Sequence, residues 1–145
     1  MKSDPTRRLA ERYPLRFFTR VLYADMDGFR HLNNGATGRY LEEGRASLNI
    51  ILFGREQMID PPAGRQLLLA GFAIDFIAQA HYPGDVEIGT AIARIGNSSY
   101  KVVQAAFQNG RCFALGEGTM VKAIGGRPAA LDDTERAAMA LHLFA

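Results

Sequence analysis

The chain has 145 residues, of which 48% are hydrophobic and 22% charged, and its formal net charge is +2. This composition is that of an ordinary globular protein and argues against disorder, while so small a charge gives no reason to expect a nucleic-acid partner. The longest apolar stretch, residues 67–80, is too short and too polar to span a membrane. A single cysteine, Cys112, excludes an intrachain disulfide and fits a reducing compartment. We therefore expect residues 1–145 to form one cytoplasmic domain.

The first predicted element is a strand over residues 17–24, where side chains alternate in character. The next ten residues, 25–34, contain two carboxylates, one histidine and two amides, and a helical pattern follows them. This polar cluster therefore lies at a strand-to-helix junction. A helix start offers unpaired backbone N–H groups, and the strand end offers a carboxylate facing them. An electrophilic carbonyl held between the two would be polarised from one side and attacked from the other.

A long amphipathic helix is predicted after the junction, ending at Gly54. Its apolar positions recur at helical spacing: Ala36, Tyr40, Leu41, Gly44, Leu48, Ile51 and Leu52. Gly38 and Gly44 lower the helix propensity, which indicates that a backbone or a ligand passes close to them.

The remainder predicts four strands, over residues 66–78, 85–95, 98–108 and 111–122. Gly96-Asn97 and Asn109-Gly110 are hairpin signals, so the last three strands should form an antiparallel meander. Asp132 and Glu135 resemble a capping box at the start of a closing helix. The predicted fold class is α+β, with one sheet packed on one long helix. Because such a sheet keeps two open edges and an uncovered second face, we expect an oligomer.

Three motifs resemble the hot-dog-fold acyl-CoA thioesterases of the 4-hydroxybenzoyl-CoA thioesterase type: Asp25-Met26-Asp27, His31-Leu32-Asn33-Asn34 and Arg39-Tyr40-Leu41-Glu42-Glu43-Gly44-Arg45. Weaker matches follow at Asp75-Phe76, Tyr82-Pro83-Gly84-Asp85 and Arg94-Ile95-Gly96-Asn97-Ser98-Ser99. The resemblance implies a hot-dog fold, in which an antiparallel sheet wraps around a long central helix, here with a short C-terminal helix. It also implies a homodimer or homotetramer with the site at a subunit interface.

In that family the second aspartate of the motif is catalytic, which implies this role for Asp27. The resemblance also implies that the backbone N–H near Asn34 polarises the thioester carbonyl. The chain departs from the family pattern at Arg30, where relatives commonly have glycine, and at Thr37, where they commonly have tyrosine. The first change is expected to affect the backbone path of the junction, and the second the wall of the pocket.

Each candidate residue also has a purely structural interpretation. Asp27 can act as nucleophile or general base, or simply form a turn with Gly28. Asp25, two residues earlier on the same strand face, is expected to hydrogen-bond locally. His31 either protonates the leaving thiolate or fixes the loop. Asn33 and Asn34 are good N-cap residues whose backbone N–H groups can face a substrate.

Farther along the chain, the candidate ligands for the pantetheine or phosphate groups of coenzyme A are Arg94, Asn97, Ser98 and Ser99, although a plain hairpin uses the same residue types. Glu42 and Glu43 are expected on a solvated helix face, although another hot-dog branch draws its carboxylate from this helix. His81 and His142 have no spacing that suggests a metal, and no metal site is predicted.

The predicted function is hydrolysis of acyl-CoA or acyl-carrier-protein thioesters without a cofactor other than the coenzyme A of the substrate, and without nucleic-acid or membrane partners. The alternatives are a non-catalytic module that binds acyl thioesters and a hot-dog dehydratase. Release of free thiol from a panel of acyl-CoA substrates distinguishes an active thioesterase from a binding module.

Overall fold

The structure is a computed structural model that describes residues 1–145. It contains six strands and two α-helices: β1 (Leu15–Arg20), α1 (Asn34–Phe53), β2 (Arg65–Phe76), β3 (Asp85–Ile95), β4 (Ser99–Gln108), β5 (Arg111–Ile124), β6 (Arg127–Pro128) and α2 (Asp133–Ala140). The sheet is antiparallel in the order β1-β3-β4-β5-β2, and the short β6 pairs with the end of β5. No helix combines the length and the apolar composition needed to cross a bilayer. The predicted helix, meander and fold class are confirmed.

The first strand is shorter than the sequence predicts, because β1 ends at Arg20 instead of residue 24. Arg20 pairs with Asp85, the first residue of β3, so the ladder has no partner for the residues that follow. Val21 makes one more backbone hydrogen bond, from its N–H to the carbonyl of Gly84 at 2.9 Å, and residues Tyr23–Asp25 then form a 3-10 turn. The polar junction is consequently a loop between β1 and α1.

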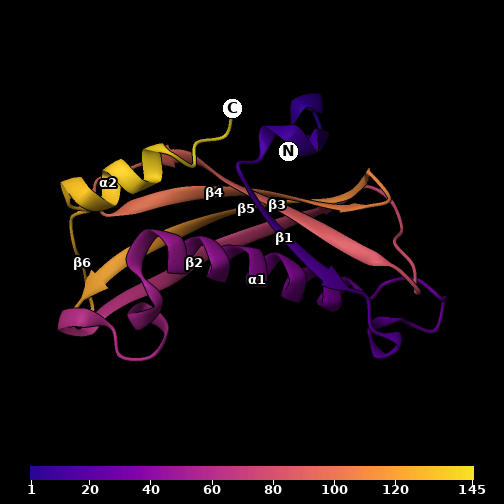
Figure 1. Cartoon of the computed structure of the whole chain (residues 1–145), viewed down its shortest axis with the longest axis horizontal. Coiled ribbons are helices and arrows are strands. Elements are labelled where there is room, and N and C mark those ends of the chain that lie inside the picture. Colours follow the sequence, from indigo (N-terminus) through magenta and orange to yellow (C-terminus); the bar gives the residue numbers. More distant parts are fainter.

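Helix α1 lies along one face of the curled sheet, where it packs against β1, β3 and β4 (Figure 1). Its close approach depends on Gly44. A Cβ atom at this position would lie only 2.8 Å from Gln104 Nε2, Ile88 Cγ2 and Thr90 Oγ1. A close approach is therefore present at Gly44, but the neighbouring atoms belong to side chains of the sheet and not to the backbone or ligand that the sequence predicts. Gly38 has no such constraint, since its nearest neighbour is Ile74 Cδ1 at 3.9 Å.

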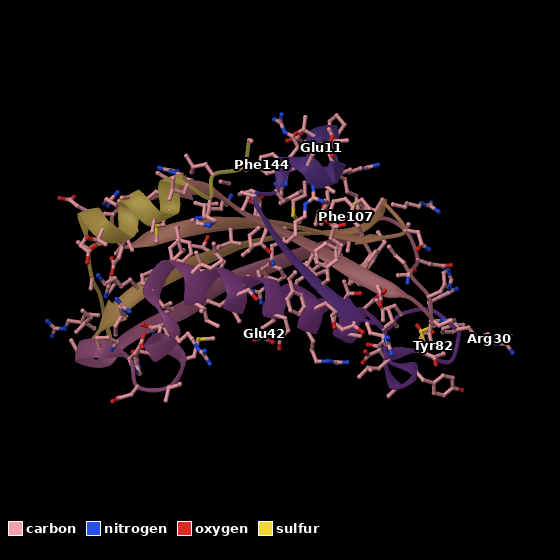
Figure 2. The ribbon with its side chains drawn as sticks, viewed as in Figure 1. Glu11, Arg30, Glu42, Tyr82, Phe107 and Phe144 are labelled. Atoms are coloured by element: carbon pink, nitrogen blue, oxygen red, sulfur yellow. The ribbon has the colours of Figure 1, made fainter.

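The second face of the sheet is partly covered, contrary to the sequence-based expectation that it is bare. The ring of Tyr13, which precedes β1, packs edge-on against Phe144 at 5.1 Å and against Phe107 at 6.3 Å, both between ring centroids. Figure 2 shows Phe144 and Phe107 on this side of the molecule. The two ends of the chain therefore close over this face by tertiary contacts that strand periodicity does not reveal. The edge strands β1 and β2 stay open.

The closing helix α2 begins as predicted, with a capping box between Asp132 and Glu135. Its Met139 is fully buried in the same hydrophobic cluster as Leu48 of α1. The Glu135 carboxylate is also buried and accepts a hydrogen bond from Lys122 Nζ at 2.9 Å. Helix α2 therefore docks on the body of the protein through Met139.

Candidate active site

The loop between β1 and α1 is held in place by the connection between β2 and β3. The N–H of Leu32 donates to the carbonyl of Ala80 at 2.8 Å, beside the bond from Val21 to Gly84 described above. Within the loop, the N–H of Asp27 donates to the carbonyl of His31 at 2.9 Å. These backbone bonds fix the carboxylate of Asp27 relative to the start of α1.

Asp25 and Asp27 point in different directions, so the prediction that they share a strand face is wrong. Asp25 lies in the 3-10 turn, where it is 7% exposed and accepts hydrogen bonds from the Tyr40 hydroxyl and from Arg39 Nη2, the latter at 2.7 Å. These two bonds reach into α1. The expected local bond is also present, since Oδ2 accepts from the N–H of Leu22 at 3.4 Å. The hydroxyl of Tyr40, with a smaller effect of Arg39, holds the pKa of Asp25 below its usual range. Asp25 therefore anchors the junction to the helix.

The carboxylate of Asp27 has one bonded oxygen and one free oxygen. Oδ1 accepts from the backbone N–H groups of Phe29 at 2.8 Å and His31 at 3.1 Å, whereas Oδ2 has no hydrogen-bond donor within the chain. The expected Asp-Gly turn is thus present, and it orients the side chain while leaving Oδ2 available. The residue is half-buried.

A cavity of about 190 Å³ lies beside this carboxylate. It brings together three of the predicted residues, Asp27, His31 and Asn34, and places them next to Thr37. The remaining wall was not predicted from the sequence. It comes from Leu32 of the junction and from the end of β2, the segment after it and β5, which contribute Phe76, Ala78, Gln79, Ala80 and Phe113. The cavity is therefore polar where the junction lines it and mostly apolar elsewhere. Thr37, which departs from the family pattern, lies in the wall as expected.

The start of α1, where Asn34 lines this cavity, contains an unpaired donor. Asn33 is the N-cap residue, and its Oδ1 accepts from the N–H of Gly35 at 2.7 Å. The N–H of Thr37 donates to the carbonyl of Asn33 at 3.1 Å. The N–H of Asn34, the first residue of the helix, has no acceptor in the chain. This donor lies at the positive end of the helix dipole, where partial negative charge is stabilised.

A second histidine lies beside the site. The rings of His31 and His81 meet edge-on with 5.5 Å between their centroids, and His81 Nδ1 lies 3.3 Å from the carbonyl oxygen of Arg30. The sequence predicts no partner for His81, because no carboxylate or cysteine lies at a metal-ligand spacing from it, and no local pattern connects it with His31. The fold brings them together through the segment after β2.

The other predicted ligands lie elsewhere in the chain. Arg94 and Ser99 line a separate hollow of about 350 Å³ at the hairpin between β3 and β4. Asn97 and Ser98 form the turn of this hairpin. The eleven residues of β3 separate this hairpin from the junction by about 33 Å at the rise of an extended strand. Within one chain, these four residues and Asp27 are not brought together.

The helix carboxylates are also outside the cavity. Glu42 and Glu43 are exposed, and Figure 2 shows Glu42 on the side of α1 that faces away from the sheet. This position agrees with the predicted solvated helix face. The structure contains no group of three or more His, Cys, Asp or Glu side chains arranged to hold a metal ion.

Comparison with known proteins gives the family. The model of the thioesterase superfamily matches residues 29–111, more than half of the chain and including the start of α1. No curated protein sequence matches the chain closely enough to count as a relative. The chain belongs to the thioesterase superfamily. It is accordingly a thioester hydrolase.

Solved structures of similar proteins support this assignment. A thioesterase from Thermus thermophilus, solved with coenzyme A and zinc, is 26% identical with a TM-score of 0.80, over 91% of this chain and 97% of that one. A predicted thioesterase from Bacillus stearothermophilus is 27% identical with a TM-score of 0.79, and the match covers 89% of this chain and 97% of that one. A Pseudomonas aeruginosa protein shares the fold with a TM-score of 0.83 at 24% identity, and the match covers 95% of this chain and 97% of that one. The expected hot-dog architecture is confirmed.

Proposed function

We propose that this thioesterase hydrolyses acyl-CoA or acyl-carrier-protein thioesters with Asp27 as its catalytic carboxylate. The observation that carries the proposal is that Asp27, with a free Oδ2, and Asn34, with an unpaired backbone N–H, line the same cavity. A carboxylate and an N–H donor facing one space are the two groups that acyl transfer requires. The similar Thermus thermophilus thioesterase, which was solved with coenzyme A, supports the choice of thiol.

The chemistry follows from these two groups. The N–H of Asn34 donates to the thioester carbonyl oxygen and stabilises the negative charge that develops on it. Oδ2 of Asp27 then attacks the carbonyl carbon, and the C–S bond breaks with departure of the thiolate. The mixed anhydride that this leaves on Asp27 is then hydrolysed by water. Alternatively, Oδ2 takes a proton from a water molecule that attacks the same carbon. His31, which lines the cavity, protonates the leaving thiolate in this proposal.

The proposed coenzyme A ligands require a second copy of the chain. Arg94, Asn97, Ser98 and Ser99 lie at the far end of β3 from Asp27, so they can serve this site only when another subunit supplies them. The open edge of β2 offers a surface for that assembly, since Leu68 and Leu69 are 47% and 44% exposed there. We propose a homodimer, or a tetramer built from it, as the active form.

Asp27→Asn tests the proposal, because it keeps the size of the side chain and removes the charge needed for attack or for proton abstraction. Thiol release from an acyl-CoA panel should fall by about a hundredfold or more, since general base catalysis alone contributes roughly 10² to 10⁴. Unfolding and oligomeric state should change little, because asparagine can form the same turn. Glu42→Gln is the matched control and should keep near-normal turnover. Loss of activity in Glu42→Gln with retention in Asp27→Asn would place the catalytic carboxylate on the helix.

A further inference from the structure

Arg30 has a backbone conformation that is unfavourable for its residue type. Its φ is +62°, in the left-handed region that glycine adopts readily and residues with a Cβ atom avoid. Arg30, which stands where relatives commonly have glycine, therefore keeps a glycine-type backbone conformation in the junction. Arginine is tolerated here at a cost in stability, and such costs are typically retained at functional sites.

Nothing within the chain compensates for this cost. The N–H of Arg30 donates to the carbonyl of Asp27 at 3.1 Å, and its carbonyl lies 3.3 Å from His81 Nδ1. Both contacts use the main chain, so glycine would make them equally well. The guanidinium has no hydrogen bond or ion pair in the chain, and the residue is exposed. The side chain of Arg30 is therefore free to bind a group that is not part of this chain.

Arg30 lines a second hollow next to the catalytic carboxylate. This hollow has a volume of about 400 Å³ and is formed by Tyr23, Met26, Asp27, Arg30 and Tyr82. Two of its walls are aromatic, since the rings of Tyr23 and Tyr82 meet edge-on with 5.5 Å between centroids. Figure 2 shows Arg30 beside Tyr82 at the same end of the molecule, with its side chain extending outward. Asp27 is the one residue that this hollow shares with the cavity beside α1.

A thioester has two arms, and the two hollows differ in the arm that they suit. The cavity between α1 and the end of β2 is smaller, and its wall away from the junction carries apolar side chains such as Phe76 and Phe113, which suit an acyl group. The second hollow is larger, carries a cation and opens toward solvent beside Arg30. Its aromatic walls suit the amide-containing pantetheine arm, and a guanidinium suits a phosphate because its planar donors match the phosphate oxygens.

We propose that Arg30 binds the phosphate of the 4′-phosphopantetheine arm while Tyr23 and Tyr82 pack along the arm. This inference rests on the proposed function, because it places the reacting carbonyl at Asp27. The phosphorylated arm occurs both in coenzyme A and on acyl-carrier proteins, so one contact serves either donor of the acyl group. Arg30 is thus a substrate-binding residue on the thiol side of the site, and the hairpin with Arg94 stays available for the nucleotide.

Substrates that share one acyl group but carry different thiol arms test the proposal. Kinetics are measured with acyl-pantetheine, which lacks the phosphate, with acyl-4′-phosphopantetheine, with acyl-CoA and with an acyl-carrier protein. Arg30→Gly should raise KM about tenfold for the phosphorylated substrates, the size expected for one hydrogen bond to a charged group. The KM for acyl-pantetheine should change less than about twofold, and kcat should be retained because the contact is shared by the ground and transition states. Comparison of the wild-type KM for acyl-CoA and for the carrier protein identifies the source of the phosphate.

A second readout separates binding from backbone strain. Arg30→Gly should raise Tm by about 3 °C, because glycine adopts the left-handed conformation without strain. Arg30→Lys retains the charge and the strain, and should change both KM and Tm much less. The remote control is Arg55→Ala, at the other end of α1, which removes an exposed arginine with no expected effect on KM. An unchanged KM for acyl-4′-phosphopantetheine in Arg30→Gly, or an equal rise for acyl-pantetheine, would overturn the proposal.

Direct binding keeps this test independent of turnover. Calorimetry with 4′-phosphopantetheine and with pantetheine should show tighter binding of the phosphorylated arm to the wild type, and Arg30→Gly should abolish the difference. Equal affinities for both compounds in the wild type would refute the phosphate site. Should the wild type bind the phosphorylated arm through Arg30 and yet release no thiol from any substrate, the proposed function fails while the Arg30 site stands.

Discussion

Replacement of Asp25 by asparagine should release the junction from α1 without touching the cavity. The Asp25 carboxylate is 7% exposed and accepts bonds from the Tyr40 hydroxyl and from Arg39 Nη2. Asparagine has one acceptor oxygen in place of two, so one of these donors loses its partner. A hydrogen bond to a charged group contributes about 1.5–3 kcal/mol, and the share of Arg39 is reduced because its side chain is largely exposed. We expect the free energy of unfolding to fall by about 2 kcal/mol at pH 7.

The loss should depend on pH in a defined direction. The Tyr40 hydroxyl lowers the pKa of Asp25 in the folded protein, whereas the unfolded chain has the ordinary aspartate pKa of about 3.9. A carboxylate with a lowered folded pKa stabilises the protein at pH values above its unfolded pKa, and that stabilisation disappears as the pH falls through the folded pKa. The difference in free energy of unfolding between wild type and Asp25→Asn should therefore have its largest value at pH 7 and pH 5, and should become smaller below about pH 4.

Urea unfolding of the two proteins across this pH range measures the effect. Tyr40→Phe and the double variant with Asp25→Asn complete a double-mutant cycle, in which the double variant should lose less than the sum of the single losses. Two results would refute the reasoning. One is a difference in stability that stays constant down to pH 3. The other is a strictly additive cycle, which would mean that Asp25 and Tyr40 do not interact.

Two further predictions concern packing and assembly. Gly44→Ala should destabilise the protein by about 1–2 kcal/mol, since overpacking against the sheet outweighs the gain in helix propensity. The matched Gly38→Ala should be neutral or stabilising, because the nearest atom to its new Cβ is Ile74 Cδ1 at 3.9 Å. Chemical denaturation compares the two variants, and equal effects on stability would contradict the packing argument. Light scattering should report at least twice the chain mass of 15.9 kDa, because the edge of β2 is open and carries exposed leucines; a monomer that keeps full activity would contradict the interface model.

Local patterns in the sequence were sufficient to predict most of the elements. The helical spacing from Ala36 onward, with Gly54 after it, predicts α1 to within a few residues because periodicity and C-cap chemistry are properties of adjacent residues. Asn109-Gly110 predicts the hairpin between β4 and β5 for the same reason, and both residues have positive φ values in the structure. Asp132 with Glu135 similarly predicts the start of α2.

The candidate site was only partly predictable from the sequence. The cluster from Asp27 to Asn34 identifies the junction because its polar residues are adjacent in the chain, and the structure places Asp27, His31 and Asn34 around one cavity. The apolar wall of that cavity was not foreseen. Phe113 reaches the site only because β5 lies between β4 and β2 in the sheet, an order that no local pattern contains.

The sequence by itself determined the long helix, the hairpins and the polar junction, since each depends on residues within a few positions of one another. Only the tertiary structure decided where β1 ends, because the strand stops where β3 no longer offers a partner. It also decided that Asp25 turns inward to Tyr40 while Asp27 faces the cavity, and that His81 meets His31. These contacts join segments far apart in the chain, and their geometry is set by the packing of α1 on the sheet.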